Sequence, residues 1–376
     1  MDPYAELGLQ PVINAAGALT YLGASVLDPE VADGVAAAAR RFVDLPALAA
    51  QVGRRLAAAT GAEAGLAVAS AAAGIVTAIA ACITGDDEGA VGLLPDWPSP
   101  RRKVVLPKAH AVSFGAPVTQ MLRLAGAVPV EAGQVNRVSS AELDRAMADA
   151  DVAAAFFVVS HHVGPEGSPD LPEFLRIARG RGVPVVVDAA AETDLRRYVA
   201  AGADLVVYSG HKAVRAPTSG ILVGRVDLVR AACLHQNSGI GRAMKVGKEQ
   251  MVGLALAVDR YVRRDVLGER ARREGVIRVL EERLAPWYRT ERTGEPDRGI
   301  PRLALVGTPS WAAGLVKALE DGIPSIRTRN HEVPIGRVTL DPRFLDDDEL
   351  AVVVARLVAL ARAGTSQGGD APRAPR

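Results

Sequence analysis

Residues 183–212 read VPVVVDAAAETDLRRYVAAGADLVVYSGHK, and they decide the fold. Two apolar runs, 183–187 and 205–208, enclose a segment long enough for one helix. Neither run alternates with polar residues, which is typical of strands covered on both faces. Further apolar runs, and helical segments between them, occur at 104–106, 140–150, 155–159, 172–181 and 220–223. This order predicts an α/β fold with a mainly parallel mixed sheet.

The rest of the chain predicts four regions around this sheet. Residues 1–27 are expected to form an irregular N-terminal arm, and residues 28–247 a large ligand-binding domain. Residues 248–362 combine long charged helices with short strands, which predicts a smaller C-terminal α/β domain. Residues 363–376 are rich in Gly, Pro and Ser and are expected to be disordered. Within the large domain, the apolar tract 64–83 is expected to be a buried helix.

Composition excludes several classes of function. Lys and Arg number 44 and Asp and Glu 43, so no overall charge attracts nucleic acid or a membrane surface. The two cysteines show no C-x-x-C spacing, so we expect neither a disulfide framework nor a metal site. The N-terminus has no apolar core of the kind that a signal peptide needs. We therefore expect a cytoplasmic protein that binds a small molecule.

A lysine and an aspartate end the two apolar runs of the deciding stretch. Asp188 follows the first run, and Lys212 lies in a Gly-containing turn after the second. Strand ends of parallel sheets face the crevice where α/β proteins bind ligands. There an amine can form an imine with an aldehyde cofactor, and a buried carboxylate can hold that cofactor's protonated ring nitrogen. The pair favours pyridoxal 5'-phosphate (PLP) bound as a Schiff base. A surface lysine and a helix-capping or metal-binding aspartate are the alternatives.

Two other features can contact the phosphate of such a cofactor. Ser209 offers a hydroxyl three residues before the lysine. A second group of small residues begins a predicted helix, where backbone N–H groups attract anions: Ser70, Ala71, Ala72, Ala73 and Gly74. Close helix packing is the alternative explanation for these small residues.

A short glycine-bounded segment carries two cations. Arg242 and Lys245 lie three residues apart in GIGRAMKVGKE, residues 239–249. Such a pair can hold a substrate carboxylate or phosphate. A basic linker between domains is the alternative.

Together these motifs resemble the fold-type-I PLP-dependent enzymes, and more narrowly the bacterial selenocysteine synthase (L-seryl-tRNA selenium transferase) family. The resemblance covers about 12–345. It is carried by PVINAAGALTYLGAS, VASAAAGIVTAIAACITG, AGAVPVEAGQVNR, VVVDAAAE, DLVVYSGHKAVRAPTSGILVG, IGRAMKVGKEQ and, more loosely, DPRFL. The chain is most similar in pattern to the tRNA-independent branch that includes D-glucosaminate-6-phosphate ammonia lyase.

The resemblance implies roles for the two strand-end residues and their neighbours. Lys212 would be the Schiff-base lysine and Asp188 the partner of the ring nitrogen. Ser209 and the Ser70–Gly74 turn would bind the cofactor phosphate. Arg242 and Lys245 would reach an active site, in the same or a neighbouring subunit of a homodimer or larger even assembly.

The resemblance also draws attention to three histidine positions. His110 lies in a loop where fold-type-I enzymes can place a residue over the cofactor ring, with a hydrogen-bonded loop histidine as the alternative. His211 would position the cofactor or move protons. His161 or His162 would reach the cofactor hydroxyl, with a surface histidine pair as the alternative.

Two departures from the family limit what can be transferred. The shared motifs start at about residue 11, so the N-terminal segment that serves tRNA in the selenium transferases is expected to be absent. The loop SHHVGPEGSPD, residues 160–170, also differs from the family pattern. We therefore expect α,β-elimination of the ammonia-lyase type on a small amino acid or amino sugar acid. Racemisation or epimerisation, β-replacement, and a non-catalytic PLP-binding relative stay open.

Overall fold

The computed structural model describes residues 3–160, 163 and 167–366. The chain divides into two compact units. The larger unit is residues 27–263, and the smaller unit combines the residues before 27 with those from 264 onward. Each unit has an apolar core of its own.

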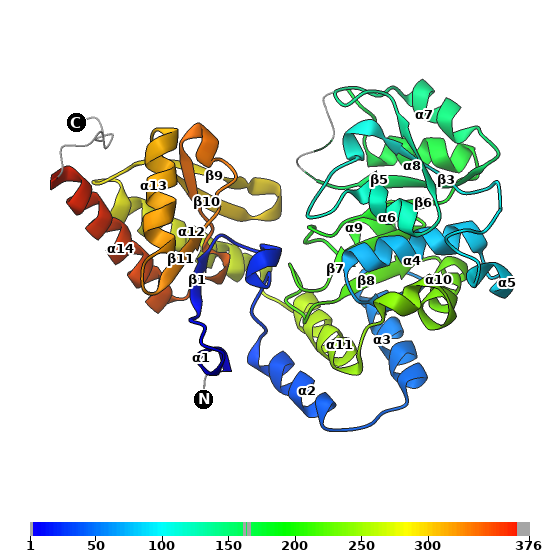
Figure 1. Ribbon diagram of the computed structural model, residues 1–376, viewed down its shortest axis with the longest axis horizontal. Coiled ribbons are helices and arrows are strands. Elements are labelled where there is room, and N and C mark those ends of the chain that lie inside the picture. Colours follow the sequence, from blue (N-terminus) through cyan, green and yellow to red (C-terminus); the bar gives the residue numbers. More distant parts are fainter. Residues whose placement is uncertain (1–2, 161–162, 164–166, 367–376) are drawn as a thin grey trace. The chain divides into compact units, whose positions relative to one another are not determined.

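The larger unit is built on a seven-stranded sheet (Figure 1). Its strands, in spatial order, are β2 (Ala64–Val68), β8 (Gly220–Gly224), β7 (Leu205–Ser209), β6 (Val185–Asp188), β5 (Val152–Val158), β3 (Lys103–Pro107) and β4 (Val128–Ala132). The strands from β7 to β4 are mutually parallel, whereas β8 is antiparallel to both of its neighbours. The predicted α/β fold with a mainly parallel mixed sheet is confirmed.

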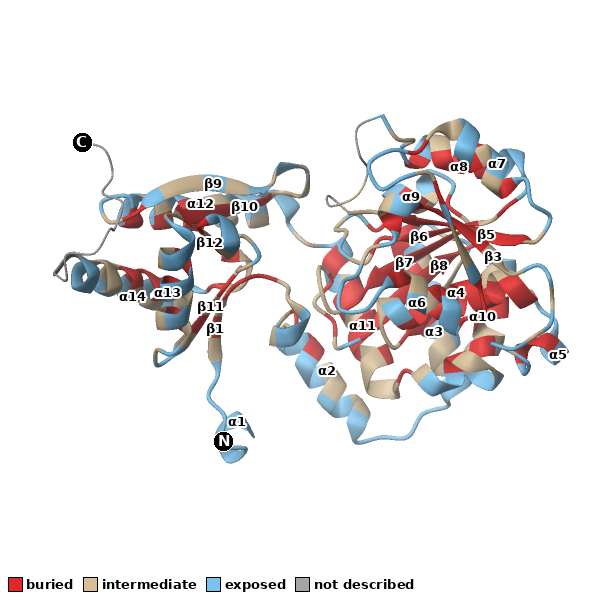
Figure 2. Ribbon diagram, turned by 45° about the horizontal axis from the view of Figure 1, so that its top comes forward, coloured by how far each residue is buried: buried red, intermediate tan, exposed pale blue. Residues whose placement is uncertain are grey.

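Helices cover both faces of this sheet, and its central strands β5, β6, β7 and β8 are buried throughout (Figure 2). Alternate strand residues belong to two separate apolar layers; Val105 and Val187 lie in one, Val104 and Val186 in the other. The helical elements are α2 (Pro29–Ala39), α3 (Leu45–Thr60), α4 (Ala71–Thr84), α5 (Glu88–Val91), η2 (Lys108–His110), α6 (Val118–Leu124), α7 (Ser140–Met147), α8 (Leu171–Gly180), α9 (Arg197–Ala200), α10 (Val226–Ser238), η3 (Ile240–Met244) and α11 (Lys248–Val262). In the described residues, no helix is long and apolar enough to cross a membrane.

The smaller unit contains two small sheets packed with helices. One has the antiparallel order β12–β10–β9, and in the other β1 pairs in parallel with β11. Its elements are α1 (Pro3–Glu6), β1 (Val12–Ala15), η1 (Thr20–Leu22), α12 (Val266–Leu284), β9 (Arg289–Glu295), η4 (Pro296–Arg298), β10 (Ile300–Val306), α13 (Pro309–Glu320), β11 (Ser325–Thr328), η5 (Val333–Ile335), β12 (Arg337–Leu340), η6 (Pro342–Phe344) and α14 (Asp347–Ser366).

The unit boundaries differ from the predicted domains at both ends. Residues 12–15 are not an irregular arm, because β1 pairs with β11 and so belongs to the smaller unit. Helix α11 belongs to the larger unit, where Arg260 forms ion pairs with Asp28 and Glu30 at the start of α2. Helix α14 continues to Ser366, past the predicted start of the tail at 363. Residues 367–376 lie outside the described part.

The tract 64–83 also differs from its prediction as one helix. Residues Ala64–Val68 form strand β2 at the edge of the sheet, and the helix begins only at Ala71. Ala and Gly give little local preference for a strand, but pairing with β8 supplies the hydrogen bonds that fix it.

Candidate active site

Asp188 and Lys212 lie at the carboxyl ends of adjacent parallel strands. Asp188 is the last residue of β6 and is paired in register with Val207 of β7. Lys212 follows the end of β7 by three residues and is partly buried. The charge of each group acts on the pKa of the other, so the structure brings the two side chains within electrostatic reach.

Burial dominates the pKa of both groups. It raises the pKa of the Asp188 carboxyl, an effect opposed by the Ala190 N–H, which donates to Oδ1 at 3.0 Å, and by the charge of Lys212. Burial lowers the pKa of the Lys212 amine, opposed by the charge of Asp188. No other group among the described residues donates to the Asp188 carboxylate. The other oxygen of this buried acid thus has no donor from the described residues and is left for a donor from elsewhere.

Ser209 and His211 form a polar pair beside the lysine. Ser209 is buried at the end of β7, and its Oγ lies 3.2 Å from Nδ1 of His211. Burial lowers the pKa of His211; a hydrogen bond with the Ser219 backbone opposes this shift, and the nearby Lys212 charge adds to it. His211 is therefore held near the lysine, and neutral imidazole is the favoured form of its ring.

The start of α4 lies against the first residue of β8. Ser70 caps the helix, and its Oγ accepts from the Ala73 N–H at 3.1 Å. The N–H groups of Ala71 and Ala72 have no acceptor among the described residues. A Cβ added to Gly220 would lie 2.5 Å from the carbonyl carbon of Ser70, so β8 approaches the helix start as closely as backbone allows. Gly220 was not predicted as a site residue, although it is the first residue of the predicted apolar run 220–223.

Gly74 has a packing role in this helix. A Cβ added there would lie 2.9 Å from Cγ1 of Val207, so the absence of a side chain lets α4 approach β7. The alternative of close packing therefore holds for this one member of the small-residue group.

His110 is a buried, hydrogen-bonded histidine. It ends η2, and its Nδ1 accepts from the Val158 N–H at 3.0 Å. Its ring meets the ring of Phe157 edge-on, with 4.4 Å between the centroids. Burial lowers its pKa to about 4. The geometry supports the loop-histidine alternative, with a neutral ring that carries its proton on Nε2.

The other predicted residues are not brought to this pair by any described contact. Arg242 lies in η3 and Lys245 directly after it, both exposed, and neither cation has a side-chain partner in the described residues. His161 and His162 lie outside the described part of the chain. In that part, no group of three or more His, Cys, Asp or Glu side chains is placed to hold a metal ion.

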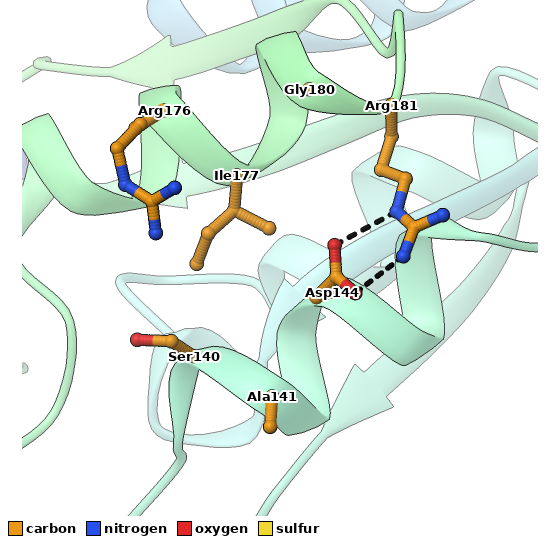
Figure 3. Close-up of a pocket in the computed structure, with 7 residues that line it drawn as sticks. All are labelled: Ser140, Ala141, Asp144, Arg176, Ile177, Gly180 and Arg181. Atoms are coloured by element: carbon orange, nitrogen blue, oxygen red, sulfur yellow. Dashed lines mark hydrogen bonds and ion pairs between the residues drawn. The ribbon is translucent and has the colours of Figure 1, made fainter.

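Two pockets on the larger unit's surface involve other residues. One, of about 400 Å³, lies between α7 and α8 beside the Arg181–Asp144 ion pair (Figure 3). A second, of about 350 Å³, is lined by Gln134, Arg137, Ser139 and Glu142. None of the predicted site residues lines either pocket.

Comparison with known proteins identifies the family. The model of the SelA family, described as L-seryl-tRNA selenium transferase, matches residues 12–285. The chain belongs to this family. The predicted recognition is confirmed, including its likeness to the ammonia-lyase branch.

Relatives within and around the SelA family carry several activities. D-glucosaminate-6-phosphate ammonia lyase of Salmonella typhimurium is 39% identical, over 95% of this chain and 97% of its own length. The 5'-C-glycyluridine monooxygenase-decarboxylase of a Streptomyces species is 42% identical, over 95% of this chain and 91% of its own. L-seryl-tRNA(Sec) selenium transferase of Solidesulfovibrio magneticus is 25% identical, over 94% of this chain and 83% of its own length.

Solved structures confirm the fold type of this SelA-family chain. The structure of D-glucosaminate-6-phosphate ammonia-lyase matches with a TM-score of 0.88 and 37% identity, covering 97% of this chain and 99% of that one. A structure of SPT with PLP internal aldimine matches with a TM-score of 0.60 and 17% identity, covering 94% of this chain and 88% of that one. The chain has the fold of the fold-type-I PLP enzymes.

Proposed function

We propose that this chain is a PLP-dependent lyase that catalyses α,β-elimination on a small amino acid or amino sugar acid and releases ammonia. The observation that carries the proposal is the pairing of Asp188 and Lys212 at neighbouring strand ends, each buried enough to shift the pKa of its group. The 39% identity to an ammonia lyase over nearly the whole chain supports the reaction type.

The residues present fit the cofactor. Lys212 Nζ would be its attachment point, since its lowered pKa increases the share of neutral amine. The unfilled acceptor of Asp188 suits a ring N–H⁺. The free N–H groups at the start of α4, together with Ser209 beside the lysine, suit a phosphate. Of these groups, the second Asp188 oxygen and the N–H groups of Ala71 and Ala72 have no partner within the described chain.

When bound, PLP supplies an electron sink for charge that develops at the substrate's α-carbon. The chain's own residues transfer protons and orient the groups around the reacting carbon. Lys212 Nζ takes the proton from the α-carbon, because its depressed pKa leaves it able to act as a base. Asp188, as a carboxylate, holds a proton on the ring nitrogen. His211 keeps the Ser209 hydroxyl oriented beside the lysine.

A second candidate is oxidative decarboxylation at the same carbon. It is favoured by the 42% identity to the Streptomyces monooxygenase-decarboxylase. The two reactions differ in what they consume and release. Elimination releases ammonia and consumes no oxygen, whereas oxidative decarboxylation consumes O₂ and releases CO₂.

Absorbance and product analysis test the proposal. The purified protein should show the visible absorbance band of lysine-bound PLP, and Lys212→Ala should lose it. The wild type is then incubated with a panel of amino acids and amino sugar acids in deuterium oxide, with O₂ uptake recorded. Keto acid plus ammonia supports elimination. Deuterium at an inverted α-carbon without ammonia would instead indicate racemisation, and a new β-substituent would indicate β-replacement. A wild type that cannot be reconstituted with PLP would overturn the proposal in favour of a non-catalytic relative.

The proposal includes a cytoplasmic location and a homodimer or larger even assembly, in which Arg242 and Lys245 reach an active site and hold a substrate anion. His161 is proposed to reach the cofactor hydroxyl. Sedimentation analysis tests the assembly, and a monomer with full activity would contradict it. Charge-removing variants at 242 and 245 should raise KM more than they lower kcat.

A further inference from the structure

A histidine that the proposed function does not use is buried between two helices of the larger unit. Helix α10 lies beside α4, and both contribute to the same apolar layer (Figure 1). His235, near the end of α10, is fully buried there. Its Nε2 lies 2.8 Å from Oγ1 of Thr84, the last residue of α4. The pair joins helix ends that are 151 residues apart in the sequence.

The hydrogen bonds of Thr84 decide which nitrogen of His235 carries the proton. The Thr84 hydroxyl lies 3.2 Å from the Ala80 carbonyl oxygen and 3.1 Å from that of Gly85, and carbonyl groups can only accept. The hydroxyl therefore donates its one proton to a carbonyl and accepts from Nε2–H of the histidine. Burial keeps the ring neutral, since it lowers the pKa of His235 to about 4. Nδ1 is then the bare nitrogen, and no group in the described residues donates to it.

Packing stability alone does not account for a histidine at this position. If leucine replaced it, the Thr84 hydroxyl would keep its bond to a carbonyl, so no buried polar atom would lose its partner. The surrounding layer is apolar. A buried acceptor without a donor is unfavourable, so the imidazole is a poorer choice for stability than an apolar side chain of similar size. We therefore infer a purpose of the ring other than stability.

The imidazole lies directly against the glycine-bounded segment that carries Arg242 and Lys245. A Cβ added to Gly239 would lie 2.7 Å from Nδ1 of His235, and the Gly239 N–H donates to the His235 carbonyl at 3.1 Å. A Cβ added to Gly241 would lie 2.9 Å from the same carbonyl oxygen. Both glycines thus let the segment approach His235 as closely as backbone allows.

The segment turns one side to the apolar layer and the other to solvent. Ile240 and Met244, four residues apart in η3, pack against the layer that α4 and α10 share. Arg242 and Lys245 are exposed. The placement of η3 on the helices therefore sets where both cations are presented.

We propose that His235 is a positioning residue for substrate binding: its hydrogen bond to Thr84 and its contact with Gly239 hold η3, so that Arg242 and Lys245 are fixed where a substrate anion binds. The inference rests on the proposed function, in which these two cations hold that anion. His235 acts through the backbone of Gly239 and contacts neither substrate nor cofactor. Cations that are already fixed lose less conformational entropy on binding than mobile ones.

Limited trypsin digestion of the full chain, loaded with PLP, tests the placement of η3 without any substrate. Trypsin cleaves after Arg242 and Lys245 when the backbone of this segment opens, and mass spectrometry measures both rates. Cleavage after Arg137, in the exposed loop before α7, is the internal reference. Thr84→Val keeps the shape of the side chain and removes the acceptor, whereas Thr84→Ser keeps the hydroxyl. His235→Leu and His235→Gln form a second pair, because glutamine can place a donor where Nε2 lies.

Thr84→Val and His235→Leu should raise cleavage after Arg242 and Lys245 by about two- to ten-fold, the effect of losing one hydrogen bond of ordinary strength. Thr84→Ser and His235→Gln should stay close to the wild-type rates. Cleavage after Arg137 should not change, and His235→Leu should melt at or above the wild-type temperature. The double variant Thr84→Val/His235→Leu should be cleaved no faster than either single variant, since both remove the same bond.

Steady-state kinetics give a second readout, with the amino acid or amino sugar acid that releases ammonia in the panel described above. His235→Leu should raise KM while kcat and the absorbance band of bound PLP stay nearly unchanged. The reason is that the cations that hold the substrate have moved, whereas the reacting groups have not. His235→Gln should restore the wild-type KM.

Gly239→Ala disturbs the same contact from the side of the segment. Its methyl group would lie 2.7 Å from Nδ1 of His235 and 2.7 Å from Cγ1 of Val91, so the segment must shift. Cleavage after residues 242 and 245 should rise in this variant. Gly92→Ala, one residue after Val91, is the matched control, because an added Cβ there meets nothing within 4 Å.

Unchanged cleavage after Arg242 and Lys245 in both Thr84→Val and His235→Leu would overturn the proposal. So would a serine or glutamine variant that behaves like its apolar counterpart, since the hydrogen bond would then not hold the segment. A lower melting temperature of His235→Leu, with equal acceleration after Arg137, would assign the histidine a purely structural role and also contradict the proposal. Failure of the proposed function would be seen separately, in a missing absorbance band or missing ammonia, while trypsin still reports on η3.

Discussion

Asp188 holds a carboxylate where water is largely excluded, at the end of a strand. Its Oδ1 is engaged by the Ala190 N–H, and its charge is balanced by Lys212. An amide at 188 would keep the shape of the side chain and lose the charge. The charge, rather than the shape, is what would keep a proton on a ring nitrogen.

We therefore predict that Asp188→Asn folds normally and binds PLP, but loses activity by roughly 100-fold or more, the range typical of lost proton control. Steady-state kinetics and the absorbance band provide the measurements. Asp144→Asn is the control, because that carboxylate forms only an exposed ion pair with Arg181. Equal activities in wild type and Asp188→Asn would contradict the assigned role.

His110 and His235 should make stability depend on pH. Burial lowers the pKa of each to about 4, from an ordinary 6.5. Between those values the unfolded chain binds more protons than the native one, so the unfolding free energy falls as pH is lowered from 6.5 to 4 and levels off below. Each histidine contributes up to about 3 kcal/mol to this fall. Urea titrations of His110→Gln and His235→Gln should each show a flatter pH profile; unchanged profiles would show that these rings are not held neutral.

Lys212 and Asp188 could be found from the sequence because each ends an apolar run, and strand ends converge in a parallel sheet. The environment of His110 could not be predicted from the sequence. Its partner, the Val158 N–H, lies 48 residues further along the chain, on another strand. Only the fold reveals that this histidine is satisfied and neutral.

At the scale of elements, the approach of β8 to α4 fixes the helix start where the cofactor phosphate is proposed to bind. Gly220 opens β8, and the nearest atoms to an added Cβ would be backbone atoms of Ser70 and Ala71 at 2.5 to 2.9 Å. Backbone cannot rotate away as a flexible side chain can. The helix start must therefore shift if this residue gains a methyl group.

Gly220→Ala should lower the melting temperature and weaken PLP binding, because the N–H groups of the helix start move out of place. Equilibrium titration with PLP and thermal unfolding give the two readouts. Gly180→Ala at the end of α8 is the matched control, since an added Cβ there meets nothing within 4 Å. If both variants bind PLP as wild type does, the helix start is not the phosphate site.

Elements with a clear hydrophobic period could be predicted from the sequence. Short strands that depend on pairing with distant strands could not. The sequence located α7, α8 and most central strands to within a few residues. Strands β1, β9 and β11 were missed, since four to seven residues with mixed polarity carry almost no period of their own. Their partners, distant in sequence, define them.

At the scale of the whole molecule, the two units have separate apolar cores. Strand β1 contributes to the core of the smaller unit, most of which comes from residues after 263. Ile13 is buried there in register with Ile326. Ile13→Ala should cost about 2–5 kcal/mol of that unit's stability. Hydrogen exchange should accelerate in β11 and β10 but stay unchanged in β5 and β6. Val135→Ala, at an exposed position, is the control; acceleration throughout the chain would show that the two units unfold as one.

The pairing of Val12 with Ser325 also has a consequence for biosynthesis. The ribosome delivers the first of these strands long before the second. Residues 27–263 contain all strands of their own sheet and can fold as they emerge. Strand β1 must wait, unpaired, until residues 325–328 have been made. The opening residues are then the last to find their place, and a nascent chain stalled before residue 325 would leave them exposed to proteases and chaperones.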